Sequence, residues 1–261
     1  MKQLSRFIQE KLQINKDDKV KQYHHQPQDK IDLVKICQDK IYKEKTWDFN
    51  DIDTSKITDM ENLFDLILDR SKIGLIENLK PKVSNWDVSN VTDMSGMFDG
   101  LSSFNDDLSF WDVSQVTDFS GMFWNCTSFE GKGLDKWDTS SAKDIHSMFK
   151  NCESFNQNLS NWDVSNVDDF GSMFRQCFKM DFDFSNWNVD KMEIASYMFY
   201  KCTNFKGKGL DKWNVNKLET SKRMFSGCEN LEVNLDNWTI PFSCDTTSMF
   251  NNCKKIPSWY K

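Results

Sequence analysis

The sequence lacks any long hydrophobic run. No stretch approaches the roughly 18 consecutive apolar residues that a membrane-spanning helix needs. The opening residues, Met1 to Arg6, are followed by no continuous apolar segment, so no secretory signal is predicted. These absences predict no membrane contact, and a protein that stays in the cytoplasm or is carried in a particle assembled in the cytosol.

Catalytic and metal-binding signatures are equally scarce. The only histidines are His24, His25 and His146, and no Ser-His-Asp arrangement can be recognised around them. The 8 cysteines include no Cys-x-x-Cys pair, whereas a structural zinc site needs four converging thiolate or imidazole ligands. We therefore expect a protein that is not an enzyme and that uses no metal or cofactor.

A net positive charge is limited to one end of the chain. The net charge is −7, but residues 1–50 hold 11 Lys+Arg against 8 Asp+Glu, a balance of +3. The remaining 211 residues have a balance of −10. Nucleic-acid binding needs clustered lysine and arginine, so the acidic body indicates a protein partner and not a nucleic acid.

A repeat of 25 or 26 residues dominates what is present. Tryptophan recurs at seven positions, and a Met-Phe pair follows each one by 11 and 12 residues. The tryptophans are Trp86, Trp111, Trp137, Trp162, Trp187, Trp213 and Trp238. A cysteine follows the phenylalanine three residues later in six of these copies, at Cys126, Cys152, Cys177, Cys202, Cys228 and Cys253. Seven copies in register indicate a repeat architecture in which each unit packs against its neighbours.

The repeat has two irregularities. A degenerate eighth copy begins at Ile52 and is followed by about nine extra residues within 65–81, which we expect to form a loop or short helix. Two Gly-Lys-Gly runs, at 131–133 and 207–209, each add one residue to a repeat. They lack the spacing of a phosphate-binding loop, and we expect bulges in which glycine takes a positive φ.

The spacing within a repeat predicts its fold. Trp111 and Val113 alternate with Asp112, as in a short strand with both apolar side chains directed inward. Phe119, Met122 and Phe123 follow the i, i+3, i+4 pattern of a helical turn, with Asp118 as its N-cap. The fold predicted is therefore α/β, a leucine-rich-repeat-like solenoid of about eight rungs, each a strand, a turn and a short helix.

Three regions follow from this pattern. Residues 1–28 are predicted to be an amphipathic arm and linker, residues 29–50 a helical cap, and residues 51–261 the repeats. The cap helix is expected over about Asp29 to Lys43, with Ile31, Val34, Cys37 and Ile41 on its apolar stripe. At the other end, residues 257–260 are expected to fold across the last repeat.

Two sets of residues are candidate binding sites. One is the row of polar side chains that follow the tryptophans: Asp87, Asp112, Asp138, Asp163, Asn188 and Asn214. Stacked in register, they would share an outward face that hydrogen-bonds locally, binds cations or meets a basic partner. The other is the apolar stripe of the arm, namely Leu4, Phe7, Ile8 and Leu12, which would either fold back on the repeats or dock the protein onto a larger assembly.

The amino-acid sequence of the repeat resembles that of a known family. Residues 161–167 read Asn-Trp-Asp-Val-Ser-Asn-Val, and Met173-Phe174-x-x-Cys177 follows. This pattern closely resembles the BspA-like repeat proteins, leucine-rich-repeat-like proteins of Bacteroidetes, mycoplasmas and some gut protists, over about four-fifths of the chain. The resemblance implies a solenoid used for adhesion or protein–protein contact, with no shared catalytic residues.

The function expected from the sequence is thus non-enzymatic protein binding or adhesion, with the arm as a possible tether to a larger assembly. A structural or accessory component of a phage particle is the first alternative. An enzyme whose site lies in the insertion at 65–81 is the second, although the insertion contains no recognisable motif.

Overall fold

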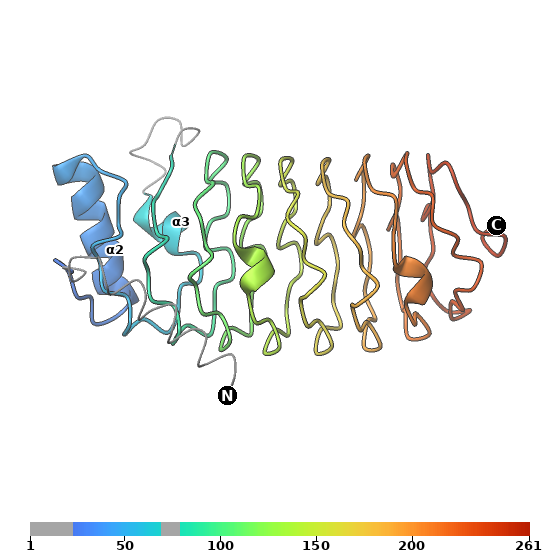
Figure 1. Cartoon of the computed structure of the whole chain (residues 1–261), viewed down its shortest axis with the longest axis horizontal. Helices are drawn as coiled ribbons and strands as arrows, with labels where there is room; N and C mark the ends of the chain where they lie inside the picture. The colour runs from blue at the N-terminus through green and yellow to red at the C-terminus, as the bar shows by residue number, and fades with distance from the viewer. Residues whose placement is uncertain (1–22, 69–78) are drawn as a thin grey trace, which may run out of the picture.

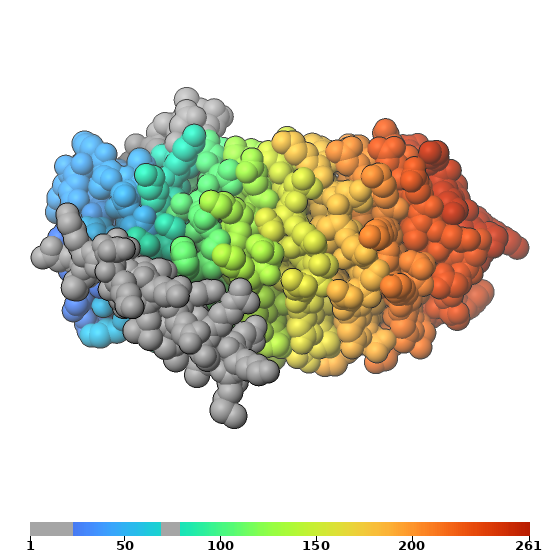
Figure 2. All heavy atoms as spheres, viewed as in Figure 1, coloured from blue at the N-terminus to red at the C-terminus, as the bar shows by residue number. Residues whose placement is uncertain are grey.

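A computed structural model describes residues 23–68 and 79–261. Turns of the chain follow one another along a single long axis, with helix α2 at one end and the C-terminus at the other (Figure 1). The stacked turns form one continuous elongated body, coloured from blue to red along its length in Figure 2. The elements are few and short: α2 (Lys30–Asp39), η1 (Lys40–Glu44), α3 (Leu63–Ile67), η3 (Leu134–Lys136) and η4 (Leu210–Lys212). No helix among the described residues combines the length and the apolar character needed to span a bilayer.

The predicted α/β fold of strand-plus-helix rungs is wrong. The described residues contain no sheet, and strand pairing is limited to isolated parallel bridges such as Asp93↔Asp118 and Asp118↔Asp144. Residues 119–123, predicted to start a helix, form turns instead. Asp118 accordingly caps no helix: its Oδ1 accepts the N–H of Ser120 at 2.8 Å within a turn. Each repeat is therefore an irregular coil without a leucine-rich-repeat rung.

Left-handed residues explain why no helix forms there. In the repeat of Trp111, Gly121 has φ +59° and Asn125 has φ +62°. The next repeat has the same pair at Ser147 and Asn151, with φ of 55° and 62°. A left-handed residue every fourth position interrupts a right-handed helix, so the i, i+3, i+4 spacing of apolar residues is produced here by consecutive tight turns.

Backbone hydrogen bonds alternate between two directions along this segment. The N–H groups of Phe119, Gly121 and Phe123 donate to carbonyls of the next repeat, at 2.9, 2.8 and 2.9 Å. The intervening N–H of Met122 donates within its own repeat to the carbonyl of Phe119, at 3.1 Å. Each buried amide thus has a partner without regular secondary structure, and neighbouring repeats are joined directly.

The expected stacking of the tryptophans is confirmed. Ring centroids of Trp111 and Trp137 lie 6.3 Å apart, and those of Trp137 and Trp162 lie 6.2 Å apart, with the planes nearly parallel in both pairs. Phe123, Phe149 and Phe174 form a second column with spacings of 5.7 and 5.6 Å. Repeats that cannot bury their own apolar side chains therefore bury them between neighbours.

The cysteine column is also present, and the thiols form hydrogen bonds. The Sγ–H of Cys152 donates to the carbonyl of Phe123 at 2.9 Å, and that of Cys177 donates to the carbonyl of Phe149 at 3.0 Å. The same bond recurs at Cys126, Cys202, Cys228 and Cys253. All eight cysteines are free. A small side chain with a weak donor fits this position. The thiol adds a second hydrogen bond to a carbonyl that already accepts a backbone N–H, as the Phe123 carbonyl accepts that of Cys126 at 3.0 Å.

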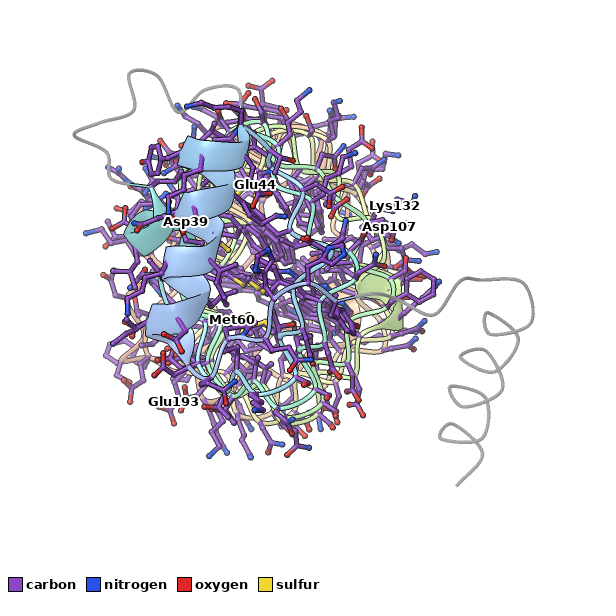
Figure 3. All side chains as sticks on the ribbon, turned by 90° about the vertical axis from the view of Figure 1, so that its left-hand side faces the viewer. Asp39, Glu44, Met60, Asp107, Lys132 and Glu193 are labelled. Atoms are coloured by element: carbon purple, nitrogen blue, oxygen red, sulfur yellow. The ribbon has the colours of Figure 1, made fainter. Side chains whose placement is uncertain are left out.

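Helix α2 covers the N-terminal end of the column (Figures 1 and 3). Its N-cap is Asp29, whose carboxylate accepts the N–H of Asp32 at 2.9 Å. Leu33, Cys37 and, in η1, Ile41 are its buried side chains. The predicted stripe is thus partly wrong, because Ile31 is 65% exposed.

The C-terminal end is closed by the chain itself, as expected. The ring of Tyr260 packs 5.1 Å from that of Phe250, and its hydroxyl accepts the N–H of Met249 at 3.1 Å. Trp259 donates from Nε1 to the carbonyl of Leu235 at 2.8 Å, as the repeat tryptophans do to their own preceding repeats. Large aromatic side chains thus cover a hydrophobic end that would otherwise face solvent.

The two Gly-Lys-Gly runs are bulges, as predicted. Gly131 and Gly133 have φ of 88° and 93°, and Gly207 and Gly209 have φ of 80° and 89°. In both cases the added residue is absorbed by a short 3-10 turn, η3 or η4. The lysine of each run lies exposed beside an aspartate of the preceding repeat; Lys132 Nζ lies 2.7 Å from Asp107 Oδ2 (Figure 3).

Candidate functional site: a cation–aromatic surface

The outward position between Phe and Cys of the repeat carries an unusual set of side chains. In Phe-x-x-Cys (Phe-x-x-Leu at 98–101), the phenylalanine is buried, the first x is at least partly exposed in every repeat but that of Ser226, and the second x takes the left-handed conformation. Successive repeats place at this first x Asp99, Trp124, Lys150, Arg175, Tyr200, Ser226 and Asn251. The four central members are a ring, two cations and a ring.

Neighbouring outward positions add further rings and cations. We call the whole set the cation–aromatic surface: Trp124, Lys150, Arg175, Tyr197, Tyr200, Lys201 and Arg223. All seven are partly or fully exposed. They come from five consecutive repeats, so only the stacking of the coils brings them together.

Cations lie over rings throughout this surface. Lys150 Nζ is 3.9 Å from the centroid of the Trp124 ring. The guanidinium carbon of Arg175 is 5.4 Å from the ring of Tyr197 and 5.2 Å from that of Tyr200. These distances fall within the range of cation–π attraction.

The edges of the surface extend the same pattern. Lys201 Nζ lies 5.5 Å from the Tyr200 ring, and Arg223 lies 5.9 Å from the Tyr197 ring. The two tyrosine rings meet edge-to-face at 5.6 Å. Each tyrosine therefore lies beside two cations. Trp124 and Lys150 form a separate pair in the two preceding repeats.

None of the four cations is paired with an acid. Among the described residues, neither Lys150, Arg175, Lys201 nor Arg223 lies within 4.0 Å of a carboxylate oxygen, and none donates a side-chain hydrogen bond to the described part of the chain. Burial lowers the pKa of Lys150, and the nearby charge of Arg175 lowers it further, against an opposing attraction from Asp99. The surface thus holds like charges close together on a protein of net charge −7.

The predicted row of polar residues after the tryptophans has a structural role. In each repeat the side-chain Oδ1 accepts the N–H two residues further on, at 3.0 to 3.4 Å. These acceptors are Asp87, Asp112, Asp138, Asp163, Asn188 and Asn214. Such Asx turns explain why only Asp or Asn stands there in these six repeats. Binding by this row remains a prediction. No cluster of three or more His, Cys, Asp or Glu suited to a metal ion occurs in residues 23–68 and 79–261.

The predicted docking arm cannot be placed. Leu4, Phe7, Ile8 and Leu12 lie outside the described residues, as does most of the insertion within 65–81.

A cavity of about 400 Å³ lies near α2, and an ion pair between Lys40 and Asp51 lines it. Lys40 is almost fully buried and its Nζ lies 2.9 Å from Asp51 Oδ2. Burial lowers the pKa of Lys40, but the hydrogen bond and charge of Asp51 outweigh this effect, so its pKa is raised. A lysine base or nucleophile requires the opposite shift. Lys40 therefore acts as a buried structural cation.

Comparison with known proteins agrees with the repeat. A family model described as "Mycoplasma protein of unknown function, DUF285" matches three times, at residues 37–134, 125–238 and 196–259. The chain belongs to this family. No curated protein and no solved structure matches it. The three matches of the DUF285 model cover nearly all of the repeats and none of residues 1–36, so the family describes a repeat protein.

Sequence reasoning missed the cation–aromatic surface, although a signal was present. When the repeats are aligned on Phe and Cys, the first residue between them is an Asp, Ser or Asn in the outer copies and a ring or cation in the four central ones. The buried columns have similar members in every repeat, whereas this outward column differs from repeat to repeat, so a search for recurring residues does not find it.

Proposed function

We propose that this chain is a non-enzymatic protein-binding repeat protein, and that the cation–aromatic surface is its interface. The observation that carries the proposal is the joint exposure of Trp124, two tyrosines and two arginines on five consecutive repeats. Trp, Tyr and Arg are the residues most enriched at the energetic centres of protein interfaces. They provide large contact area, donors and charge at low conformational cost.

Rigidity favours the same role. The surface side chains stand on turns joined to both neighbouring repeats, as when the N–H of Phe174 and that of Gln176 donate to the next repeat at 2.9 and 2.8 Å. A partner that binds here loses little entropy in ordering the site.

The resemblance to the BspA-like repeat proteins supports a role in adhesion or protein–protein contact. Membership of the DUF285 family adds a repeat architecture, whose extended surfaces are typical of binding proteins. We therefore propose binding to a protein partner, which an assembly or a surface could display.

A pull-down with a matched control tests the proposal. Wild-type protein, the variant W124A/Y200A and the control F110A are immobilised and exposed to lysate of the source cells. Phe110 is an exposed ring with a cation, Lys136, 5.9 Å from its centroid, but it lies outside the cluster. We expect a partner that wild type and F110A retain and W124A/Y200A loses.

Two results would contradict the proposal. One is a wild-type protein that retains no partner above the blank matrix. The other is a partner that W124A/Y200A retains as well as wild type does, provided that all three proteins show the same melting temperature.

A further inference from the structure

We propose that the cation–aromatic surface binds an extended acidic peptide segment, laid along the axis of the stack with carboxylates on Lys150 and Arg175. The inference rests on the proposed function and names the chemistry of the partner.

The charge of the surface is the first argument. Some exposed lysines of the repeats have carboxylate partners, such as Lys132 with Asp107 at 2.7 Å and Lys208 with Asp183 at 2.9 Å. The four cations of the surface have rings as neighbours in place of carboxylates. An aromatic face attracts a cation but leaves its charge unneutralised, so the complementary ligand is an anion.

The geometry of Arg175 indicates which anion. Its guanidinium lies near the rings of both Tyr197 and Tyr200. No donor of this guanidinium meets an acceptor among the described residues, and its Nε is buried as well as unpaired. A guanidinium offers a planar fork of N–H groups that matches the two oxygens of a carboxylate. The two Nη groups, unlike the buried Nε, are the donors available for it here.

Lys150 supplies a second site one repeat away. Its Nζ lies over the Trp124 ring, and its pKa is lowered by burial and by the neighbouring Arg175. A carboxylate placed between the two cations would relieve the repulsion that this shift reflects. Binding of the carboxylate should therefore favour the protonated form of Lys150, and protonation of Lys150 should in turn strengthen the binding.

The spacing of the repeats suits an extended chain. A buried phenylalanine precedes each surface residue in the chain, and the centroids of these rings give the spacing of the repeats. The distance is 5.6 Å between Phe149 and Phe174 and 5.9 Å between Phe174 and Phe199. Alternate side chains of an extended peptide lie roughly 6.6 Å apart. Side chains on one face of the peptide would thus meet successive repeats, and about seven residues would span the surface from Trp124 to Arg223.

The aromatic side chains and the acidic body favour a peptide over a denser polyanion. Trp124 and the two tyrosines offer apolar contact that a peptide can match with its own side chains. A nucleic acid carries a charge at every phosphate and would meet the negative charge of the surrounding protein, which is −10 over residues 51–261. A short acidic segment brings few charges and places them on cations of this surface that have no carboxylate partner among the described residues.

Fluorescence anisotropy with two labelled peptides tests the inference. The probes are a 12-residue peptide that alternates glutamate with serine around one tyrosine, and the same peptide with glutamine at each glutamate. The proteins are wild type, K150Q/R175Q and the control K132Q/K208Q, which changes the net charge by the same amount at lysines outside the surface. Heparin and single-stranded DNA serve as competing anions of other classes.

We expect the glutamate peptide to bind wild type about tenfold more tightly than the glutamine peptide at low salt, because two charge-assisted hydrogen bonds are lost with glutamine. K150Q/R175Q should bind about tenfold more weakly, and K132Q/K208Q should match wild type. Equal binding of both peptides, or equal loss in both variants, would overturn the inference. So would preferential binding of heparin or DNA.

The two proposals fail separately. If W124A/Y200A loses its partner in the pull-down while wild type binds the glutamate and glutamine peptides equally, protein binding stands and the acidic ligand is refuted. If the pull-down is unaffected by W124A/Y200A, the proposed function itself falls.

Discussion

The indole Nε1 of Trp162 donates a hydrogen bond of 2.7 Å to the backbone carbonyl of Leu134 in the preceding repeat. The same bond joins Trp111 to Val83, Trp137 to Leu108 and Trp187 to Leu159. Each tryptophan thus fills the core and pairs a carbonyl that lies on no regular ladder. Both requirements together explain why this position is tryptophan in seven repeats, since phenylalanine could meet only the first.

Substitution of this tryptophan should therefore be costly. We expect Trp162→Phe to destabilise the protein by about 1 to 3 kcal/mol, because the Leu134 carbonyl keeps only the N–H of Trp137 at 3.2 Å and the smaller ring leaves a cavity. Urea titration followed by circular dichroism measures the change. Trp124→Phe is the matched control, because its Nε1 has no acceptor among the described residues; a loss as large there would contradict the role assigned to the hydrogen bond.

Thiol reactivity should divide the cysteines into two groups. Cys244 and Cys253 are partly exposed, whereas Cys37, Cys126, Cys152, Cys177, Cys202 and Cys228 are buried. Burial raises the pKa of all eight thiols, that of Cys253 to about 12. We expect a thiol reagent at neutral pH to modify Cys244 and Cys253 slowly and the buried six only after unfolding. Mass spectrometry of the modified peptides decides, and rapid labelling of Cys177 in the native protein would contradict the buried column.

One histidine should make stability depend on pH. His146 replaces a serine of other repeats, and its Nδ1 lies 3.4 Å from Asp169 Oδ1. The hydrogen bond to Asp169 raises the pKa of His146, and burial only partly offsets this rise. Because the folded pKa lies above the unfolded value of about 6.5, the stabilisation is fully present below that value and is lost as pH rises through the folded pKa.

The variant His146→Ser tests this dependence. The stability of wild type should exceed that of the variant by more at pH 5.5 than at pH 8, by less than about 1 kcal/mol because the pair is half exposed. Thermal unfolding of both proteins across this range gives the difference. Parallel pH profiles would show that the contact with Asp169 contributes nothing.

The glycines of the bulges should tolerate no side chain. Gly131 has φ +88°, and a Cβ there would lie 2.5 Å from the ring of Phe155. Gly121 has φ +59°, but the nearest atom to its Cβ would be 3.9 Å away. We expect Gly131→Ala to cost about 2 kcal/mol or more, and Gly121→Ala only the roughly 1 kcal/mol of a left-handed alanine. Equal midpoints of thermal unfolding for the two variants would contradict the close packing of the bulge.

Much of the core followed from the sequence. The period of Trp111, Trp137 and Trp162 implied stacking, because side chains repeated in register have no other neighbours of their own kind. The positive φ of Gly131 and Gly207 followed from one extra residue in an otherwise fixed period. The local conformation did not follow, because Phe119, Met122 and Phe123 have the same spacing in a helix and in consecutive turns.

The sequence by itself determined the repeat, its buried columns and the positions of its irregularities, because these depend on which residues recur and at what interval. Only the tertiary structure decided the path of the chain within a repeat. Ser147 has no preference of its own for the left-handed conformation, and its N–H is held by a hydrogen bond of 2.9 Å to the Gly171 carbonyl in the next repeat. It also decided the cation–aromatic surface. Trp124, Lys150, Arg175 and Tyr200 are about 25 residues apart in the chain, and they become neighbours only because the coils stack in register.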